Sequence, residues 1–174
     1  MNAIVAVDEK WGIGRGGELL FSIPEDMRFF KSMTEGKVVV MGRRTFESLP
    51  GGKPLKNRVN IVLTSGMTPT GGKTTPLQAR YEERVIVCNS LDQLFEMVSE
   101  YDPDDVFVIG GQNLYEQLLG RCSRVFVTKV RREKKADRWF PDLDSLDGWA
   151  AESKSEDREW SGLTYAFYVY INKN

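Results

Sequence analysis

The segment KVVVMGRRTFESLP, residues 37–50, decides the fold. Its first part, Val38–Met41, is a short continuous apolar run, which is typical of a strand that is buried on both faces. Gly42 follows, and Arg43–Leu49 has the composition of a helix. A buried strand that passes directly into a helix is the unit from which parallel sheets covered by helices are built.

The same alternation of strand and helix extends outward in both directions from this segment. Further apolar runs predict strands at Ala3–Val7, Val59–Leu63, Val85–Cys88, Val106–Ile109, Val125–Val130 and Thr164–Ile171. Helix-like stretches lie between several of them, at Pro24–Met33, Leu91–Ser99 and Asn113–Leu119. Three C-terminal strands have no helix between them and are expected to pair antiparallel: Val125–Val130, Trp149–Ser153 and Thr164–Ile171. We therefore expect a single-domain α/β fold over residues 1–174, with a mixed, mostly parallel central sheet, helices on both faces and an antiparallel C-terminal edge.

The composition limits the partners of the chain. It has 174 residues, of which 41% are hydrophobic, enough for the core of one domain. Lysine and arginine number 24 against 25 acidic residues, so no basic field favours nucleic acid. The N-terminus is apolar only briefly, and no later run is long enough to span a bilayer. We expect no nucleic-acid partner, no membrane association and a cytoplasmic location.

The chain has no histidine and two cysteines. The missing histidine excludes Ser-His-Asp and Cys-His nucleophile pairs and histidine general bases. Cys88 and Cys122 lie in or beside apolar segments, which is typical of inert buried thiols, and two cysteines cannot complete a four-ligand zinc site. We expect no metal. Because the chain has no histidine, any proton chemistry must use carboxylates, lysine, tyrosine or water.

Asp26 is the first candidate for that chemistry. The segment Ser22–Glu25 has the spacing of a capping box, so a helix is expected to begin there. On this helix Asp26 falls on the same face as Ile23 and Phe30, where an apolar residue is expected. A carboxylate on the apolar wall of a cleft has a raised pKa and a function by default. The alternative is an ordinary first-turn acid that the helix dipole stabilises.

Three glycine-containing segments would let the backbone approach a ligand. The loop Glu9–Phe21 has the glycines of a lid that closes over ligands, although an ordinary crossover fits its composition as well. Gly42–Thr45 places two arginines at a helix start after a strand, which favours a phosphate site over a solvated basic turn. The pair Gly110-Gly111 follows another strand in the same way.

Ser65–Arg84 is rich in Gly, Thr and Pro and is expected to be an exposed loop.

Several of these segments together resemble dihydrofolate reductase. The likeness is carried in order by Ile13-Gly14, by Ile23–Met27 with Phe29–Lys31, and by Val40–Pro50. It continues through Asn57–Thr64, Val108–Gly111, Tyr115–Leu118, Thr128, and Asp137 with Phe140–Asp142. The resemblance therefore covers nearly the whole chain, with its motifs in the family's order and spacing.

The resemblance implies NADPH-dependent reduction of 7,8-dihydrofolate to 5,6,7,8-tetrahydrofolate, which supplies one-carbon metabolism and thymidylate synthesis. It implies that Asp26 hydrogen-bonds the pterin and favours protonation of the ring that receives the hydride, and that Thr128 supports this carboxylate. A lone anion in an apolar cleft suits a cationic pterin in the transition state. Antifolates are expected to bind the same site, and the working unit is expected to be a monomer.

The family's functional residues are carried over by the same resemblance. The catalytic positions are Asp26, Phe21 and Thr128. The substrate-binding positions are Val5, Ala6, Asp26, Phe30, Leu49, Arg58, Ile109, Tyr115 and Thr128. The cofactor-binding positions are Ala6, Ile13, Gly14, Gly42, Arg43, Arg44, Thr45, Leu63, Thr64, Ser65, Ile109, Gly110, Gly111, Gln112, Asn113, Leu114 and Tyr115. Arg58 is expected to pair bidentately with the folate α-carboxylate, and Arg43 with Arg44 favours NADPH over NADH. An adenosine-binding subdomain is expected at roughly residues 38–108.

The resemblance also predicts two features of backbone geometry. Glu9–Phe21 would be a lid over the nicotinamide, with Asp137 bonding its backbone in the closed state. The peptide between Gly110 and Gly111 would be cis, as in the family's diphosphate turn.

The chain departs from the family at the end of the lid. Leu19-Leu20-Phe21 stands where the family shows Leu-Pro-Trp, and phenylalanine cannot donate the hydrogen bond with which the tryptophan holds a water near the substrate. We expect normal folding with slower proton delivery or altered substrate affinity, and Leu20 replaces a proline that stiffens the loop. Asn113 stands where some relatives carry a further arginine for the 2′-phosphate.

Two alternatives remain open. Another pterin or flavin-pathway reductase would share this fold and its phosphate sites, although Asp26 with Arg58 favours folate. A folate- or nucleotide-binding module without catalysis would fit the loss of the tryptophan, although Asp26 with Thr128 argues against it.

Overall fold

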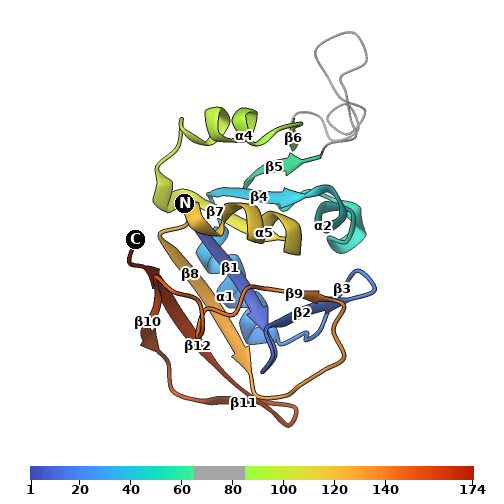
Figure 1. Ribbon diagram of the computed structural model, residues 1–174. Coiled ribbons are helices and arrows are strands. Elements are labelled where there is room, and N and C mark those ends of the chain that lie inside the picture. The colour runs from blue at the N-terminus through green and yellow to red at the C-terminus, as the bar shows by residue number, and fades with distance from the viewer. Residues whose placement is uncertain (65–84) are drawn as a thin grey trace.

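The computed structural model describes residues 1–64 and 85–174, and its centre is a nine-stranded sheet (Figure 1). The strands are β1 (Asn2–Val7), β4 (Val38–Gly42), β5 (Val59–Leu63), β6 (Val85–Cys88), β7 (Val106–Gly110), β8 (Arg124–Val130), β10 (Trp149–Lys154), β11 (Arg158–Trp160) and β12 (Leu163–Asn172). They follow the order β10-β12-β8-β1-β7-β4-β5-β6, with β11 beside β12. The pairs from β8 to β6 are parallel, whereas β12 is antiparallel to β8, β10 and β11. The expected mixed, mostly parallel sheet with an antiparallel C-terminal edge is confirmed.

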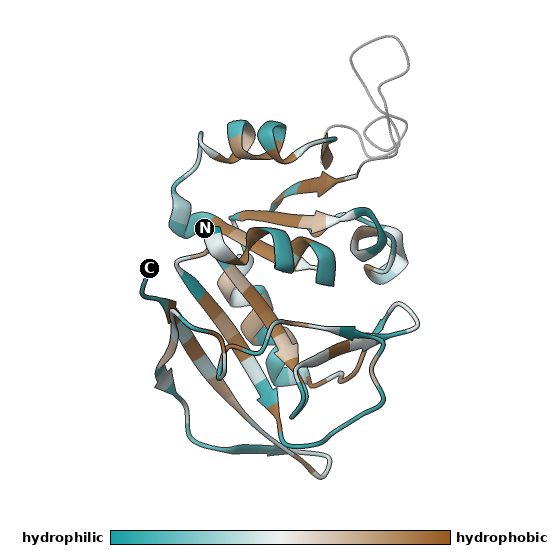
Figure 2. Cartoon of the chain, viewed as in Figure 1, coloured by the Kyte–Doolittle hydropathy of each residue, from teal (hydrophilic) through white to brown (hydrophobic). Residues whose placement is uncertain are grey.

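Helices cover both faces of this sheet, as expected (Figure 1). They are α1 (Pro24–Thr34), α2 (Arg43–Glu47), α4 (Leu91–Val98) and α5 (Gln112–Leu118). The alternation along β4 separates two cores: Val38 and Val40 pack in the cluster of α4 and α5, whereas Val39 and Met41 pack in the cluster of α2. Figure 2 shows the result, with hydrophobic strands between helices whose outer surfaces are hydrophilic.

The predicted strands and helices of the described residues are present, but the helix α2 ends earlier than expected. It was predicted over Arg43–Leu49 and ends at Glu47. The N–H of Ser48 bonds back to the carbonyl of Arg44, and the chain then turns into the 3-10 helix η1 (Pro50–Gly52). Two further 3-10 turns are η2 (Pro103–Asp105) and η3 (Leu119–Arg121).

The predicted capping box at the start of α1 is wrong. The N-cap residue is Ile23, and no side chain caps the first turn. Glu25 instead accepts a hydrogen bond of 2.5 Å from the Tyr165 hydroxyl and pairs with Arg158. Because these partners come from β11 and β12, far along the sequence, tertiary pairing replaces the local capping contact that the spacing suggested.

A second, three-stranded sheet organises the loop Glu9–Phe21, for which the sequence predicted no rigid element. It consists of β2 (Gly12–Arg15), β3 (Glu18–Leu19) and β9 (Arg138–Trp139), in the order β3-β2-β9. A Cβ atom added at Gly12 would lie 2.8 Å from the Cβ of Ala136, so the close approach of the two segments requires glycine. The sequence did not indicate these short strands because the partner strand β9 lies in a distant part of the chain.

The two cysteines are free and buried, as expected. Burial raises the pKa of the Cys88 thiol to about 11 and that of Cys122 to about 12, so both behave as neutral apolar groups. In the described part of the chain, no helix is long and apolar enough to cross a membrane. The expected loop Ser65–Arg84 lies outside the described residues.

Candidate active site

Asp26 lies where the face of α1 meets the strand β8. Asp26 is the third residue of the helix, and Thr128 of β8 is 2% exposed. The Thr128 hydroxyl donates a hydrogen bond of 2.6 Å to Oδ1 of Asp26. Two segments that are far apart in sequence therefore meet in one carboxylate–hydroxyl pair.

Burial is the main influence on the Asp26 carboxyl. It raises the pKa of Asp26 above the ordinary value of 3.8, and the hydrogen bond from Thr128 opposes this shift without cancelling it. Within the described residues no lysine or arginine forms an ion pair with Asp26. The carboxyl is thus a solitary group that exchanges a proton closer to neutral pH than an exposed aspartate does.

The neighbouring acid, Glu25, has a different environment. Its two oxygens are held by Tyr165 and Arg158, which fixes the first turn of α1 against the C-terminal strands. Burial and this contact raise the pKa of Tyr165 to about 12, so the tyrosine remains a donor. Glu25 anchors the helix, and Asp26 beside it is left for chemistry.

A wall of apolar and cationic groups continues along α1. The Arg58 guanidinium lies 6.0 Å from the ring centre of Phe30. Its Nε donates to the Thr34 hydroxyl at 2.9 Å, and one terminal nitrogen donates to the Lys56 carbonyl at 2.8 Å. Arg58 forms no ion pair in the described residues, and the Glu35 carboxylate acts on it only through a longer-range electrostatic interaction. A cation held by neutral oxygens suits an anionic ligand.

Two glycine turns meet at the carboxyl ends of β4 and β7. Met41 is paired with Gly110, and a Cβ added at Gly42 would lie 3.9 Å from the Gly110 oxygen and from the Gly111 nitrogen. The Gly110-Gly111 peptide is cis, as the resemblance predicted. A Cβ at Gly111 would lie 3.2 Å from the Thr45 hydroxyl oxygen, closer than most side chains tolerate. The two turns therefore expose glycine backbone, without side chains, beside the Thr45 hydroxyl. This arrangement suits a diphosphate group.

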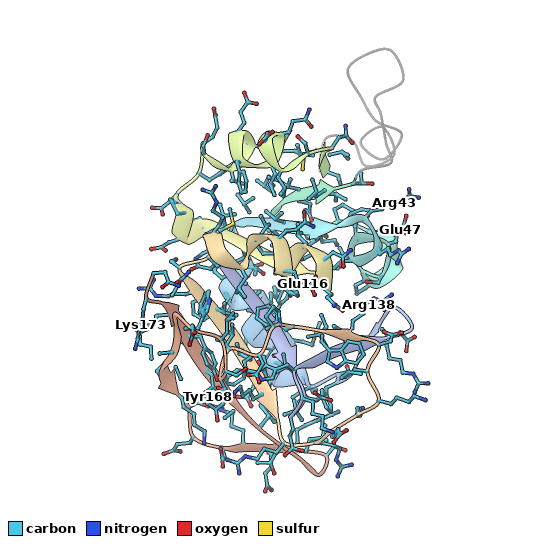
Figure 3. The ribbon with its side chains drawn as sticks, in the orientation of Figure 1. Arg43, Glu47, Glu116, Arg138, Tyr168 and Lys173 are labelled. Atoms are coloured by element: carbon cyan, nitrogen blue, oxygen red, sulfur yellow. The ribbon has the colours of Figure 1, made fainter. Side chains whose placement is uncertain are left out.

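The two arginines after Gly42 differ in their contacts. Arg43 pairs with Glu47 one turn later on α2 at 2.7 Å, and both are labelled in Figure 3. Arg44 makes no ion pair in the part of the chain that the structure describes. An anionic ligand at this edge of the sheet could therefore pair with Arg44 directly, whereas it would compete with Glu47 for Arg43.

The remaining substrate and cofactor positions fall into two groups. The first group lies in strands or directly after them: Val5 and Ala6 in β1, Ile13 and Gly14 in β2, Leu63 in β5, Thr64 after β5, and Ile109 in β7. Leu49 and Ile109 pack on one core cluster beside these turns. Ser65 lies outside the described residues.

The second group lies on α5. Gln112 donates to Glu116 and accepts from the amide of Trp139 at 3.0 Å, so it connects the helix to β9. Asn113 is exposed, whereas Leu114 is buried in the main core. Tyr115 is also buried, and its hydroxyl donates to the Ile4 carbonyl at 2.8 Å. The backbone amides of Leu114 and Tyr115 both donate to the Gly111 carbonyl at 3.0 Å, so these two residues fix the glycine turn at the start of α5.

Asp137 connects the lid to β9. Its Oδ2 accepts from the amide of Gly16 at 2.9 Å, and its own amide donates to the Gly14 carbonyl at 3.0 Å. The contact that the resemblance predicted between Asp137 and the lid backbone is therefore present.

The structure adds two residues that the sequence did not single out. Asp8 is 2% exposed, and its carboxylate accepts from the amides of Lys10, Gly12 and Lys134 at 2.7–3.0 Å. The side chain of Lys134 contacts Leu20 and Phe21. An aspartate directly after a buried strand was a usable signal for Asp8, whereas nothing in the sequence marks Lys134 among its charged neighbours.

Comparison with known proteins agrees with this geometry. The family model described as dihydrofolate reductase matches residues 1–172. The dihydrofolate reductase of Bacillus subtilis (strain 168) is 34% identical over 174 residues, which cover 98% of this chain and 94% of the relative. That of Schistosoma mansoni is 35% identical over 190 residues, which cover 98% and 95%.

A solved structure extends the similarity to three dimensions. Dihydrofolate reductase from Enterococcus faecalis, complexed with NADP(H) and RAB-propyl, superimposes with a TM-score of 0.81. It is 29% identical, and the match covers 99% of this chain and 96% of that one. The chain belongs to the dihydrofolate reductase family.

Proposed function

We propose that Asp26 is the group that manages the proton in this enzyme, which reduces 7,8-dihydrofolate to tetrahydrofolate with NADPH. The single observation that carries the proposal is the half-buried Asp26 carboxyl, bonded to Thr128 and without an ion-pair partner in the described residues. Such a carboxyl stabilises a positive charge that develops on a bound ring. Its raised pKa also means that it keeps its proton to a higher pH than an exposed aspartate does.

The hydrogen bond from Thr128 determines which oxygen of Asp26 is available. Thr128 occupies Oδ1, which leaves Oδ2 to accept from the amino group and ring nitrogen of the pterin. The bound ring becomes more basic because the carboxylate favours its cationic form. NADPH supplies the hydride that this protonated ring accepts.

Phe30 of α1, together with Leu49 and Arg58, would bind the remainder of the substrate. Phe30 and Leu49 provide apolar surface for the pterin and benzoyl rings. Arg58, held by Thr34 and by a backbone carbonyl, would pair with the α-carboxylate of the folate glutamate. Antifolates with a similar ring and tail would use the same contacts.

The cofactor would lie along the carboxyl ends of β4, β5 and β7. Gly110-Gly111 and Thr45 would hold the diphosphate, because the missing Cβ atoms leave room for close approach. Arg43 and Arg44 would bind the 2′-phosphate and so select NADPH over NADH. Residues 38–108 would form the subdomain around the adenosine.

Phe21 carries no N–H and cannot hold a water by donation from its ring. Its side chain is 6% exposed and packs with Ile23 and Tyr165. We expect Phe21 to support the substrate by packing only, with proton delivery slower than a donor at that position would allow.

The proposal also includes a monomeric enzyme in the cytoplasm that binds neither nucleic acid nor membranes. The acidic and basic residues nearly balance, so no basic field favours nucleic acid. A single species of 19.8 kDa in light scattering would support the monomer.

The test is the loss of NADPH absorbance in the presence of dihydrofolate, with purified wild type and Asp26→Asn, and with NADH in parallel. Wild type should oxidise NADPH rapidly and NADH slowly. Asp26→Asn should lose activity at pH 7 by about 100-fold or more, the usual range for a positioned acid–base group. Tight binding of both ligands without turnover by wild type would instead indicate a binding module.

A further inference from the structure

Lys134 contacts both ends of the lid segment 9–21. Its backbone N–H donates to Oδ2 of Asp8 at 3.0 Å, directly before the segment. Its Nζ donates to the Leu20 carbonyl at 2.6 Å and lies 4.6 Å from the ring centre of Phe21, at the end of the segment. One residue of the 131–137 loop therefore joins the two points at which the lid leaves the body of the protein.

The first of these points is rigid. The buried Asp8 carboxylate also accepts from the amides of Lys10 at 2.8 Å and Gly12 at 2.7 Å. Three backbone donors satisfy it, so the lid's first turn and the 131–137 loop share one fixed anion. Because the amide of Lys134 is one of these donors, the position of its side chain is set from this end.

The second point depends on the Lys134 ammonium. Leu20 and Phe21 are 9% and 6% exposed and pack in the same core cluster as Ile23. The amide of Leu20 has only a long bond of 3.4 Å to the Ile13 carbonyl. In the described residues Lys134 forms no ion pair, so its charge serves the Leu20 carbonyl and the Phe21 ring.

We propose that Lys134 is a positioning residue for hydride transfer. It holds Leu20 and Phe21 in place, so that the lid keeps its position relative to Asp26 in the first turn of α1. The tip of the lid turns at Gly16 and Gly17, with φ of 61° and 87°, a conformation that glycine adopts without strain. The inference rests on the proposed function of Asp26, since Lys134 acts through the segment that leads into its helix.

A simpler role is that the Lys134 stem only covers apolar surface, as exposed lysines often do. Lys134→Met separates the two roles, because methionine keeps an unbranched apolar stem and removes the ammonium. The matched control is Lys135→Met: Lys135 borders the same shallow hollow beside Leu20 and has no hydrogen bond or ion pair within the described residues.

The experiment measures three quantities on the full chain of each variant: the single-turnover rate of hydride transfer with saturating NADPH and dihydrofolate, amide hydrogen exchange at Leu20 and Phe21, and the thermal midpoint. In Lys134→Met the hydride step should slow by about tenfold or more, in line with losing one charge-assisted hydrogen bond and one exposed cation–π contact. Exchange at Leu20 and Phe21 should accelerate by a similar factor. Lys135→Met should match wild type.

Equal hydride rates and equal exchange in the two variants would overturn this role of Lys134. A slower hydride step with unchanged exchange at Leu20 and Phe21 would also overturn it, because the lid would then not have moved. The exchange measurement needs no turnover: if wild type failed to transfer hydride, the proposed function would fall, and faster exchange confined to Lys134→Met would still establish the contact.

Discussion

The environment of Asp26 that suits the proposed reaction is unfavourable for the folded state when the carboxyl is ionised. Burial raises its pKa, so the folded state prefers the neutral carboxyl. Stability from this preference is fully present below the ordinary value of 3.8 and is lost as the pH rises through the raised pKa. Above that pKa the folded protein carries a half-buried anion that no cation in the described residues compensates.

Asp26→Asn should consequently raise the thermal midpoint at pH 7, because the amide removes this anion. We expect an increase of roughly 2–4 °C, which corresponds to about 1 kcal/mol in a domain of this size. The gain should disappear below pH 3.8, where both versions are neutral. Asp147→Asn, at an exposed position, serves as the control and should change little. A midpoint at pH 7 that falls in Asp26→Asn would show that the ionised carboxylate stabilises the fold.

Thr128 determines where the Asp26 carboxyl titrates. Its hydrogen bond favours the ionised form and so lowers the pKa against the effect of burial. Thr128→Val keeps the shape and removes this bond, so the pKa should rise further. Because turnover needs a proton in the site, the rate should fall with increasing pH, and in Thr128→Val this fall should begin at a higher pH, by about one unit or less for the loss of one hydrogen bond. An unchanged or lowered midpoint in the pH–rate profile would contradict this assignment.

At the scale of elements, the cofactor turn depends on the contact of β7 with α2. Gly111 lies so close to the Thr45 hydroxyl that an added Cβ would approach it to 3.2 Å. Gly111→Ala should push the turn away from Thr45 and raise KM for NADPH by about tenfold, the effect of losing one good hydrogen bond to a charged group. KM for dihydrofolate should change less.

Gly120→Ala is the control for this substitution, because a Cβ at Gly120 meets no atom within 4 Å. It should leave both KM values unchanged. Equal values of KM for NADPH in the two variants would mean that the Gly111 turn does not bind the cofactor.

The elements that the sequence predicted are those whose signals are local. Val38–Met41 and Val59–Leu63 are apolar runs that identify buried strands wherever they occur. The helix α1 was also evident, but its expected cap was wrong because Glu25 finds Tyr165 and Arg158 instead. The sheet of β2, β3 and β9 could not be predicted, since its pairing joins segments that only the finished fold brings together.

The candidate site divides in the same way. The position of Asp26 on the apolar face of its helix indicated a functional carboxylate from the residues alone. Its partner Thr128 came only from the resemblance, because no spacing rule connects a residue of β8 with a helix so far away in the sequence. The sequence did not indicate the contacts of Lys134 with Leu20 and Phe21, since a lysine in a charged segment is ordinarily a solvated side chain.

At the scale of the whole molecule, one face of the sheet connects the two halves of the site. Helices α1 and α2 lie on that face, over β8 with Thr128 and over β4 with its glycine turn. Register between β4 and β7 places the cofactor turns together, and register between β1 and β8 places Ala6 beside Thr128. The parallel sheet thereby brings the proposed cofactor turns and the Asp26–Thr128 pair to the same face.

The central claim is that the Asp26 carboxyl manages the proton for hydride transfer. The most direct measurement is the single-turnover rate of hydride transfer from NADPH to dihydrofolate, as a function of pH, in wild type and Asp26→Asn. In Asp26→Asn the substrate must take its proton from water, so the rate should be low at pH 7 and rise by about tenfold for each unit of decreasing pH. The wild-type rate should instead level off below the raised pKa of Asp26. A rate in Asp26→Asn that equals wild type at pH 7, or that does not increase as the pH falls, would contradict the claim.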